Sequence, residues 1–203
     1  MSTLSVSAIL LSAGESTRMG QPKATLPWLG MQLIQYQISS LIDAGCAPVV
    51  VVLGHRPELQ QPFIPKVDLL KVIVNSSYQD GKTTSIKAGL RLAGNDSCGV
   101  MVLAVDQPRS AELLKLLVGA HLAKRALITA PFYQGKFGHP VIFSRTLFPE
   151  LREITEETMG LRMLMERYSG QLNQVTVDNP VIHLDMNGQE DYLRALASAE
   201  ATK

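Results

Sequence analysis

The stretch SAILLSAGESTRMGQPKATLPWLG, Ser7 to Gly30, combines an apolar, strand-like run with a glycine loop and two nearby cations. The run ends at Leu11, Gly14 follows, and Arg18 and Lys23 come within nine residues of that glycine. In an α/β fold, a loop that leaves a buried strand presents free backbone N–H groups, which attract an anion. Gly14 would let the chain pass closely under a polyphosphate, while the two cations reach its oxygens. The alternative is a surface turn that carries two solvated cations.

Two common phosphate-binding motifs do not fit this loop. The dinucleotide fingerprint G-x-G-x-x-G requires a second glycine where the chain has Ser16. The P-loop pattern G-x-x-x-x-G-K-[ST] requires a glycine where the chain has Met19. The sequence therefore supports neither a Rossmann dehydrogenase nor a Walker-type ATPase.

Apolar, β-rich runs alternate with helical patterns along the first two thirds of the chain. Unbroken runs of this kind indicate strands that are buried on both faces, as in a parallel sheet. The runs are Val6–Leu11, Pro48–Leu53, Lys71–Asn75, Val100–Val105 and Ala126–Ala130. Between them, apolar residues repeat on one helical face around 34–42, 86–93 and 113–118. The alternation predicts an α/β fold with a Rossmann-like, doubly wound, mostly parallel sheet sandwiched by helices, and a ligand beyond the carboxyl ends of its strands.

The pattern becomes less regular after about residue 131. It predicts a short strand at Gly138–Phe143, a helix at Gly160–Tyr168, strands at Leu172–Val177 and Val181–Leu184, and a last helix at Glu190–Ala197. No linker, repeat or low-complexity tract interrupts the chain. We therefore expect one domain over residues 1–203, with a C-terminal elaboration from about residue 131 onward.

Composition excludes several classes of protein. With 46% hydrophobic and 18% charged residues, 203 residues are enough for a packed core. The net charge is +1, from 19 basic and 18 acidic residues, so no global field favours nucleic acid or an anionic membrane. No apolar run is long enough for a membrane span, and the start does not resemble a signal peptide. Cys46 and Cys98 have no metal-ligand spacing, and a reducing cytoplasmic setting is expected.

The string S-A-G-E-S-T-R-M-G-Q-P-K, which ends at Lys23, resembles the signature L-A-A-G-x-S-x-R-M-G-x-P-K-x-L-L of the MobA-like nucleotidyltransferases. The likeness is greatest to their molybdenum cofactor cytidylyltransferase branch and spans about residues 6–193. It implies a fold of the nucleotide-diphospho-sugar transferase type and a loop that holds an NTP triphosphate. It also implies that the half at about 1–110 binds the NTP and that the elaboration at about 131–203 binds the acceptor. Arg18 and Lys23 would then bind phosphate and take part in catalysis. The loop backbone would approach the nucleotide at Leu11, Ser12, Ala13 and Gly14.

Two aspartates carry the expected metal site. Asp106, in LAVDQPRS, matches the D-Q-P with which the family holds Mg²⁺, although an aspartate after a strand often caps a helix instead. A hard cation on carboxylate oxygens offsets the charge that gathers at the α-phosphate, so Asp106 is also expected to be catalytic. Asp185, in VIHLDMNGQEDYLRAL, resembles the family's D-I-D-T-P-E-D-Y, but Asn187 replaces the second acid. Asp185 would be the second ligand or only a cap of the last helix, and Asn187 could bind through its amide oxygen.

Weaker matches extend the expected site. Asn75, Gly81 and Ser85 match N-x-x-W-x-x-G-M-S-S-S-L-R-A-G-L, a segment that in the family lies along the base and ribose, although a capped amphipathic helix explains it equally well. Gly54 matches a family stretch at the end of the second strand and is also expected at the nucleotide. His139, in GKFGHPVIFSRTLFPEL, resembles the cytidylyltransferase branch and is expected at the acceptor, with a structural histidine as the alternative.

The resemblance implies a Mg²⁺-dependent nucleotidyltransferase that moves NMP from an NTP to a phosphorylated acceptor and releases pyrophosphate. CTP and molybdenum-loaded molybdopterin are the expected substrates, and an apo-molybdoenzyme that receives the product is a further expected partner. Ala13 favours CTP over GTP only weakly, because other branches also carry it. The alternatives are a GTP-using guanylyltransferase, a nucleotidyltransferase for sugar or isoprenoid-precursor phosphates, and a non-catalytic nucleotide-binding regulator.

Overall fold

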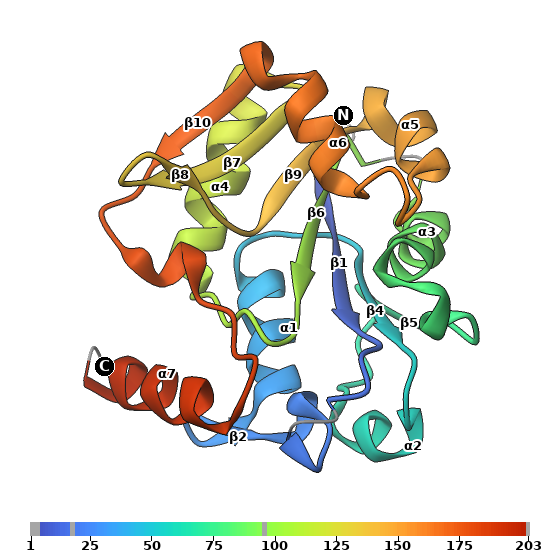
Figure 1. The fold of residues 1–203 in the computed structure, drawn as a ribbon, viewed down its shortest axis with the longest axis vertical. Coiled ribbons are helices and arrows are strands. Elements are labelled where there is room, and N and C mark those ends of the chain that lie inside the picture. The colour runs from blue at the N-terminus through green and yellow to red at the C-terminus, as the bar shows by residue number, and fades with distance from the viewer. Residues whose placement is uncertain (1–4, 17–18, 95–96, 202–203) are drawn as a thin grey trace.

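A computed structural model describes residues 5–16, 19–94 and 97–201. Its centre is an eight-stranded sheet in the order β10-β7-β9-β6-β1-β4-β5, with β8 paired to β7 (Figure 1). Along that order the strands are Leu172–Thr176, Ile128–Tyr133, Val141–Ser144, Gly99–Ala104, Val6–Ser12, Val49–Leu53 and Leu70–Val74, and β8 is Lys136–Phe137. The strands run parallel except β9, which is antiparallel to both β6 and β7, and β8, which is antiparallel to β7. The predicted α/β class with a mostly parallel sheet is confirmed.

Strand β1 lies in the middle of the sheet because both of its faces are apolar. Every residue of β1 is buried, and successive side chains enter opposite layers. Leu10 belongs to the core on one face and Ile9 to the core on the other. Neighbours β4 and β6 both pair with β1 in parallel, so the carboxyl ends of these three strands lie at the same edge.

Helices cover both faces of the sheet. On the Leu10 face, the core contains residues of α1 (Leu33–Asp43), α4 (Ala111–Lys124) and α7 (Gln189–Ala201). On the Ile9 face it contains residues of α3 (Lys82–Leu92), α5 (Phe148–Glu153) and α6 (Leu161–Arg167). The short α2 (Pro57–Gln60) follows β4. No helix in the described ranges is long and apolar enough to cross a membrane.

Two expectations about strands were wrong. The segment predicted as a strand at Val181–Leu184 forms a 3-10 helix, η7 (Pro180–His183), because the Asn179 side chain accepts from the backbone N–H of Val181 at 2.8 Å and starts a turn. The β5 run is a strand, but it is not buried on both faces. It forms an edge of the sheet and leaves Val72 42% and Val74 48% exposed. An apolar run alone does not distinguish an edge strand from a central one.

Candidate active site

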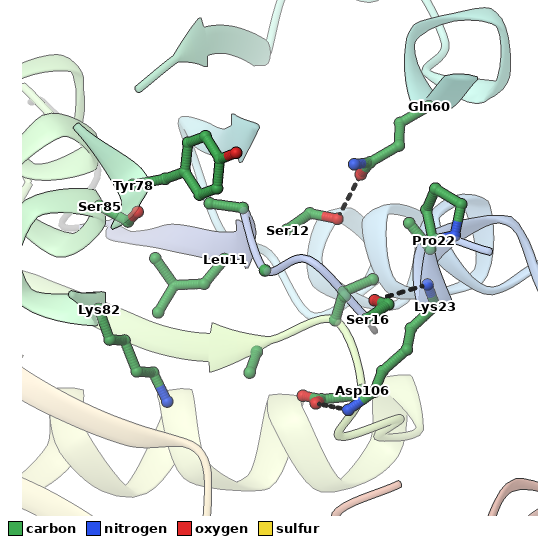
Figure 2. A pocket seen from close by; sticks show the side chains of 15 residues that line it. Leu11, Ser12, Ser16, Pro22, Lys23, Gln60, Tyr78, Lys82, Ser85 and Asp106 are labelled. Carbon is green, nitrogen blue, oxygen red and sulfur yellow. Dashed lines mark hydrogen bonds and ion pairs between the residues drawn. The ribbon is translucent and has the colours of Figure 1, made fainter. Parts of the chain in front are cut away.

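A cavity of about 280 Å³ lies at the carboxyl ends of β1 and β6 (Figure 2). Its position follows from the parallel pairing of these strands, which brings the loops after them to one edge of the sheet. Seven residues predicted for the site line it, namely Leu11, Ser12, Ala13, Gly14, Lys23, Ser85 and Asp106. Arg18, predicted to bind phosphate, lies outside the described residues.

Lys23 and Asp106 meet inside this cavity. The ammonium Nζ of Lys23 donates to Oδ2 of Asp106 at 2.7 Å, and the two side chains are 14% and 21% exposed (Figure 2). They are 83 positions apart in the sequence. The ion pair therefore joins the loop after β1 to the loop after β6, and it presents a cation and an anion together to any ligand that enters.

Side-chain hydrogen bonds hold the loop after β1. The Ser12 hydroxyl donates to Oε1 of the buried Gln60 at 2.6 Å, which ties the end of β1 to α2. The Ser16 hydroxyl accepts from the backbone N–H of Lys23 at 3.1 Å, which closes the loop on itself. Since Ser16 and Gln60 also line the cavity, the groups that shape the loop also form the wall of the site.

Two glycines near the cavity, Gly14 and Gly54, differ in whether the structure has room for a side chain at their positions. A Cβ on Gly14 would meet no atom within 4 Å in the described part of the chain, and the backbone there does not require a positive φ. A Cβ on Gly54 would lie 2.6 Å from the Ala13 carbonyl oxygen and 2.8 Å from Cβ of Tyr78. Gly54 is therefore needed by the packing, whereas the space beside Gly14 is open to a ligand.

Replacing Gly14 by alanine tests this difference. We expect the melting temperature to change little, because the backbone tolerates a side chain there. We expect the KM for the nucleotide to rise about tenfold, which corresponds to about 1.4 kcal/mol of lost binding. Gly54→Ala should instead unfold at a lower temperature, because overpacking costs about 1–3 kcal/mol. Thermal melts and nucleotide titrations of both variants measure the contrast, and a Gly14→Ala protein with unchanged nucleotide KM would contradict it.

Asn75 and Gly81 do not line the cavity but build the wall that carries Ser85. The Asn75 amide donates to the hydroxyls of Thr84 at 2.9 Å and Ser85 at 3.0 Å. Gly81 has a φ of 112° and lies directly against the side chain of Glu156, whose Oε1 accepts from the backbone N–H of Thr83 at 2.7 Å. These contacts fix the first turn of α3, so Asn75 and Gly81 support the site from behind.

Asp185 lies beside the cavity rather than in its lining. The backbone N–H of Met186 donates to the Asp106 carbonyl at 3.0 Å, which brings the two loops together. Asp185 is exposed, yet the surrounding protein desolvates its carboxyl enough to raise its pKa, and the charge of Asp106 raises the pKa further. Lys23, Lys82 and Arg109 act in the opposite direction. The two carboxylates therefore repel each other, and a cation between them would relieve that repulsion.

The cap of the last helix comes from another residue. The carboxylate Oδ2 of Asp191 accepts from the backbone N–H groups of Asn187 and Gly188, each at 3.2 Å. Asp191 therefore performs at the start of α7 the capping role that was the alternative for Asp185.

The donor set around Asp106 fits a hard divalent cation. Within the described residues, no group of three or more His, Cys, Asp and Glu side chains could hold a metal. Magnesium commonly needs only one or two carboxylates and takes its other ligands from phosphate and water. Asp106 already binds the cation of Lys23 at 2.7 Å, so this carboxylate oxygen faces a position where positive charge is stable. Asp106 and Asp185 are the residues that would hold the ion.

His139 lies outside the lining of the cavity. Its backbone N–H donates to the carbonyl of Ile182 at 2.9 Å. The side chain is exposed, but nearby protein still desolvates the ring and lowers its pKa to about 4. Lys82 and Arg109 lower this pKa further, and Asp106 opposes the shift. At neutral pH the ring is uncharged, so His139 can offer a hydrogen bond but no positive charge to an acceptor.

Sequence reasoning missed several residues of the cavity, including Gln60, Tyr78 and Lys82. Lys82 begins α3 and enters the cavity from the side opposite Lys23 (Figure 2). A cation in the first turn opposes the helix dipole, so its place there does not stabilise the helix. That mismatch is a signal in the sequence that could have identified Lys82 as a binding residue.

Residues 8–174 match the family described as the MobA-like NTP transferase domain. The chain belongs to this family. The match includes the Lys23 loop and Asp106 and ends before Asp185. The predicted MobA-like family is confirmed, and with it the class of nucleotidyltransferase.

Two relatives match nearly the whole of this MobA-like chain. The molybdenum cofactor cytidylyltransferase of Escherichia coli (strain K12) is 25% identical over 191 residues, which are 94% of this chain and 95% of that protein. The nicotine blue oxidoreductase of Paenarthrobacter nicotinovorans is 26% identical over 202 residues, which are 94% of this chain and 96% of that protein. These names describe different reactions, so neither substrate transfers directly to this chain.

Solved structures share the MobA-like fold. Rv0371c from Mycobacterium tuberculosis H37Rv superposes with a TM-score of 0.84 at 24% identity and covers 97% of this chain and 100% of that chain. A complex of Rv0371c with manganese superposes with a TM-score of 0.78 at 22% identity and covers 96% and 98%. At these identities the likeness shows the fold alone.

Proposed function

We propose that this MobA-like protein transfers CMP from CTP to a phosphorylated acceptor, molybdenum-loaded molybdopterin, with Mg²⁺ as cofactor. The observation that carries the proposal is the contact of Lys23 with Asp106 in one cavity at the mouths of β1 and β6. Transfer of a nucleotidyl group needs a cation for the phosphates and a carboxylate for a metal within reach of the same triphosphate. Lys23 and Asp106 would supply these two groups.

We assign each residue at the cavity a separate role in nucleotide binding or charge neutralisation. The backbone of Ser12, Ala13 and Gly14 would guide the nucleotide, and Lys23 would move from Asp106 to the phosphate oxygens. Asp106 and Asp185 would hold Mg²⁺, which neutralises charge on the phosphates when bound. Lys82 adds a second positive charge from the opposite wall.

The reaction needs no nucleophile from the protein. A phosphate oxygen of the acceptor attacks the α-phosphorus of CTP and forms the new P–O bond. The bond from the α-phosphorus to the bridging oxygen breaks, and pyrophosphate leaves with that electron pair. The protein contributes position and charge neutralisation, which supply most of the catalysis in phosphoryl transfer.

The choice of CTP and molybdopterin is supported by likeness to the Escherichia coli cytidylyltransferase over 94% of this chain. A GTP-using enzyme, an enzyme for sugar or isoprenoid-precursor phosphates, and a regulator without catalysis remain the alternatives. The name of the nicotine blue oxidoreductase adds an oxidoreductase as a further alternative. Ser16 argues against a dinucleotide cofactor in the first loop, because it replaces a glycine of the usual fingerprint.

A pyrophosphate-release assay tests the proposal. We expect turnover with CTP, Mg²⁺ and molybdenum-loaded molybdopterin, and less with GTP. Separate reactions contain a hexose 1-phosphate or methylerythritol phosphate as acceptor, and a parallel assay follows oxidation of NADPH. Preference for GTP, or activity only with a sugar phosphate, would overturn the substrate choice. Binding of CTP with no pyrophosphate from any acceptor would favour the regulator.

A further inference from the structure

Arg109 is a buried cation that the proposed reaction does not use. It is 1% exposed and follows Asp106-Gln107-Pro108 in the loop after β6. Burial lowers the pKa of its guanidinium to about 10, while the charges of Asp185 and Asp106 oppose that shift. The group is thus charged at neutral pH, and no carboxylate in the described part of the chain pairs with it directly. A buried, unpaired charge is costly unless its donors are used.

Carbonyl oxygens from three segments use those donors. Nε donates to the His139 carbonyl at 2.9 Å, and Nη1 donates to the carbonyl of Pro108 at 2.9 Å. Nη2 donates to the carbonyls of Ile182 and Leu184, each at 3.1 Å. The partners lie 1, 30, 73 and 75 positions away, so one guanidinium joins three loops that are distant in the sequence.

The contacts of Arg109 lie next to Asp185. Leu184, directly before Asp185, is held by the guanidinium, and Met186, directly after it, donates its backbone N–H to the Asp106 carbonyl at 3.0 Å. Asp185 is therefore fixed on both sides to the loop that carries Asp106. A flexible link would let the two like charges move apart.

The Asp106 loop is itself anchored from behind. Gln37 of α1 is fully buried, and its amide donates to the carbonyls of Ala104, Val105 and Gln107 at 3.2, 3.3 and 2.8 Å. Its Oε1 accepts from the backbone N–H of Arg109 at 3.2 Å. Gln37 thus holds the backbone at Arg109 in place, and the guanidinium extends from there to the loop at His139 and to the segment at Ile182 and Leu184.

From these contacts we infer that Arg109 is a positioning residue that sets the separation of the Asp106 and Asp185 carboxylates and thereby the affinity of the site for a divalent cation. This inference rests on the metal site of the proposed function. The planar fork of arginine serves four carbonyls at once, which the ammonium of lysine cannot do from the same place. Groups that orient metal ligands typically change metal affinity 10–100-fold when they are replaced.

The test is the dissociation constant of Mn²⁺, measured by electron paramagnetic resonance on the full chain without substrates. We expect Arg109→Met and Arg109→Lys to raise this constant about tenfold or more, because both lose the fork. Leu151→Ala is the matched control: it opens a cavity in the core at α5 and should lower the melting temperature while changing the Mn²⁺ constant less than twofold.

Each outcome decides the inference. Unchanged Mn²⁺ affinity in both Arg109 variants would overturn it. The inference would also be wrong if Leu151→Ala weakened Mn²⁺ binding as much as the Arg109 variants do, because lost stability would then explain the effect. It would be wrong as well if Arg109→Lys kept the Mn²⁺ affinity of the wild type, because a positive charge alone would then be enough. If Arg109→Met fails to fold, Arg109→Lys still decides. Asp106→Asn separates the inference from the proposed function. If Asp106→Asn binds Mn²⁺ as well as the wild type, the proposed metal site is wrong. If Asp106→Asn loses Mn²⁺ affinity while both Arg109 variants keep it, only the inference about Arg109 is wrong.

Discussion

Replacement of Asp106 by asparagine is expected to lower the rate of pyrophosphate release on the order of 10²-fold or more. Asparagine keeps the size of the side chain but removes the negative charge that would hold a divalent cation. It also removes the carboxylate oxygen that contacts Lys23 at 2.7 Å. Loss of one main electrostatic stabiliser of a transition state commonly costs about 10²–10³-fold in kcat.

The measurement compares kcat, the KM for CTP and the Mn²⁺ dissociation constant in wild type and Asp106→Asn. Asp43→Asn is the matched control, because Asp43 is exposed at the end of α1, and its turnover should stay within about twofold of the wild type. Thermal melts verify that Asp106→Asn still folds. Turnover that equals the wild type would remove Asp106 from the mechanism.

The sequence predicted that Lys23 and Asp106 lie close together, because the relevant signals are local. An unbroken apolar run predicted β1, and the loop that follows it needed no long-range information. Lys23 and Asp106 then meet because β1 and β6 pair in parallel, so the loops after both strands leave the same edge of the sheet. Placing both residues after strands was therefore enough to predict their proximity.

Predictions that depended on tertiary contacts were less exact. The antiparallel direction of β9 and the edge position of β5 depend on strand order, which apolar runs do not encode. Asn75 matched a family segment, but its amide bonds Ser85 behind the cavity wall. His139 also matched and lies outside the cavity lining, so its place at the acceptor stays a prediction. A motif match thus indicates a region of the chain but does not fix the direction of each side chain.

Arg109 shows why the role of some residues cannot be predicted from the sequence. It stands directly after a predicted metal-binding motif, where an arginine would ordinarily be taken as a solvated cation. Arg109 is buried, and its guanidinium donates to carbonyls of segments up to 75 positions away. Every residue has a backbone carbonyl, so the sequence does not show which carbonyls accept from a given side chain. Gln37 is similar, since its polar side chain lies on the buried face of an amphipathic helix and serves the loop of Asp106.

Replacement of Lys23 by methionine is expected to change two measurements in opposite directions. Turnover should fall on the order of 10²-fold, because the phosphates lose a cation in a site that is largely shielded from water. The affinity of the free protein for Mn²⁺ should rise about fivefold, because the ammonium no longer competes for Oδ2 of Asp106. That gain corresponds to about 1 kcal/mol, the upper range for an ion pair that retains some exposure.

The opposite signs make this variant more informative than a simple loss of activity. Lys124→Met serves as the control, because it removes the same charge from an exposed position at the far end of α4 and should change neither measurement. If Lys23 only stabilised the loop, both turnover and Mn²⁺ affinity would fall together. If it were a solvated surface cation, both would stay at the values of the wild type. Only a lysine that lies on the metal carboxylate before substrate binds, and on the phosphates afterwards, weakens catalysis while it strengthens metal binding.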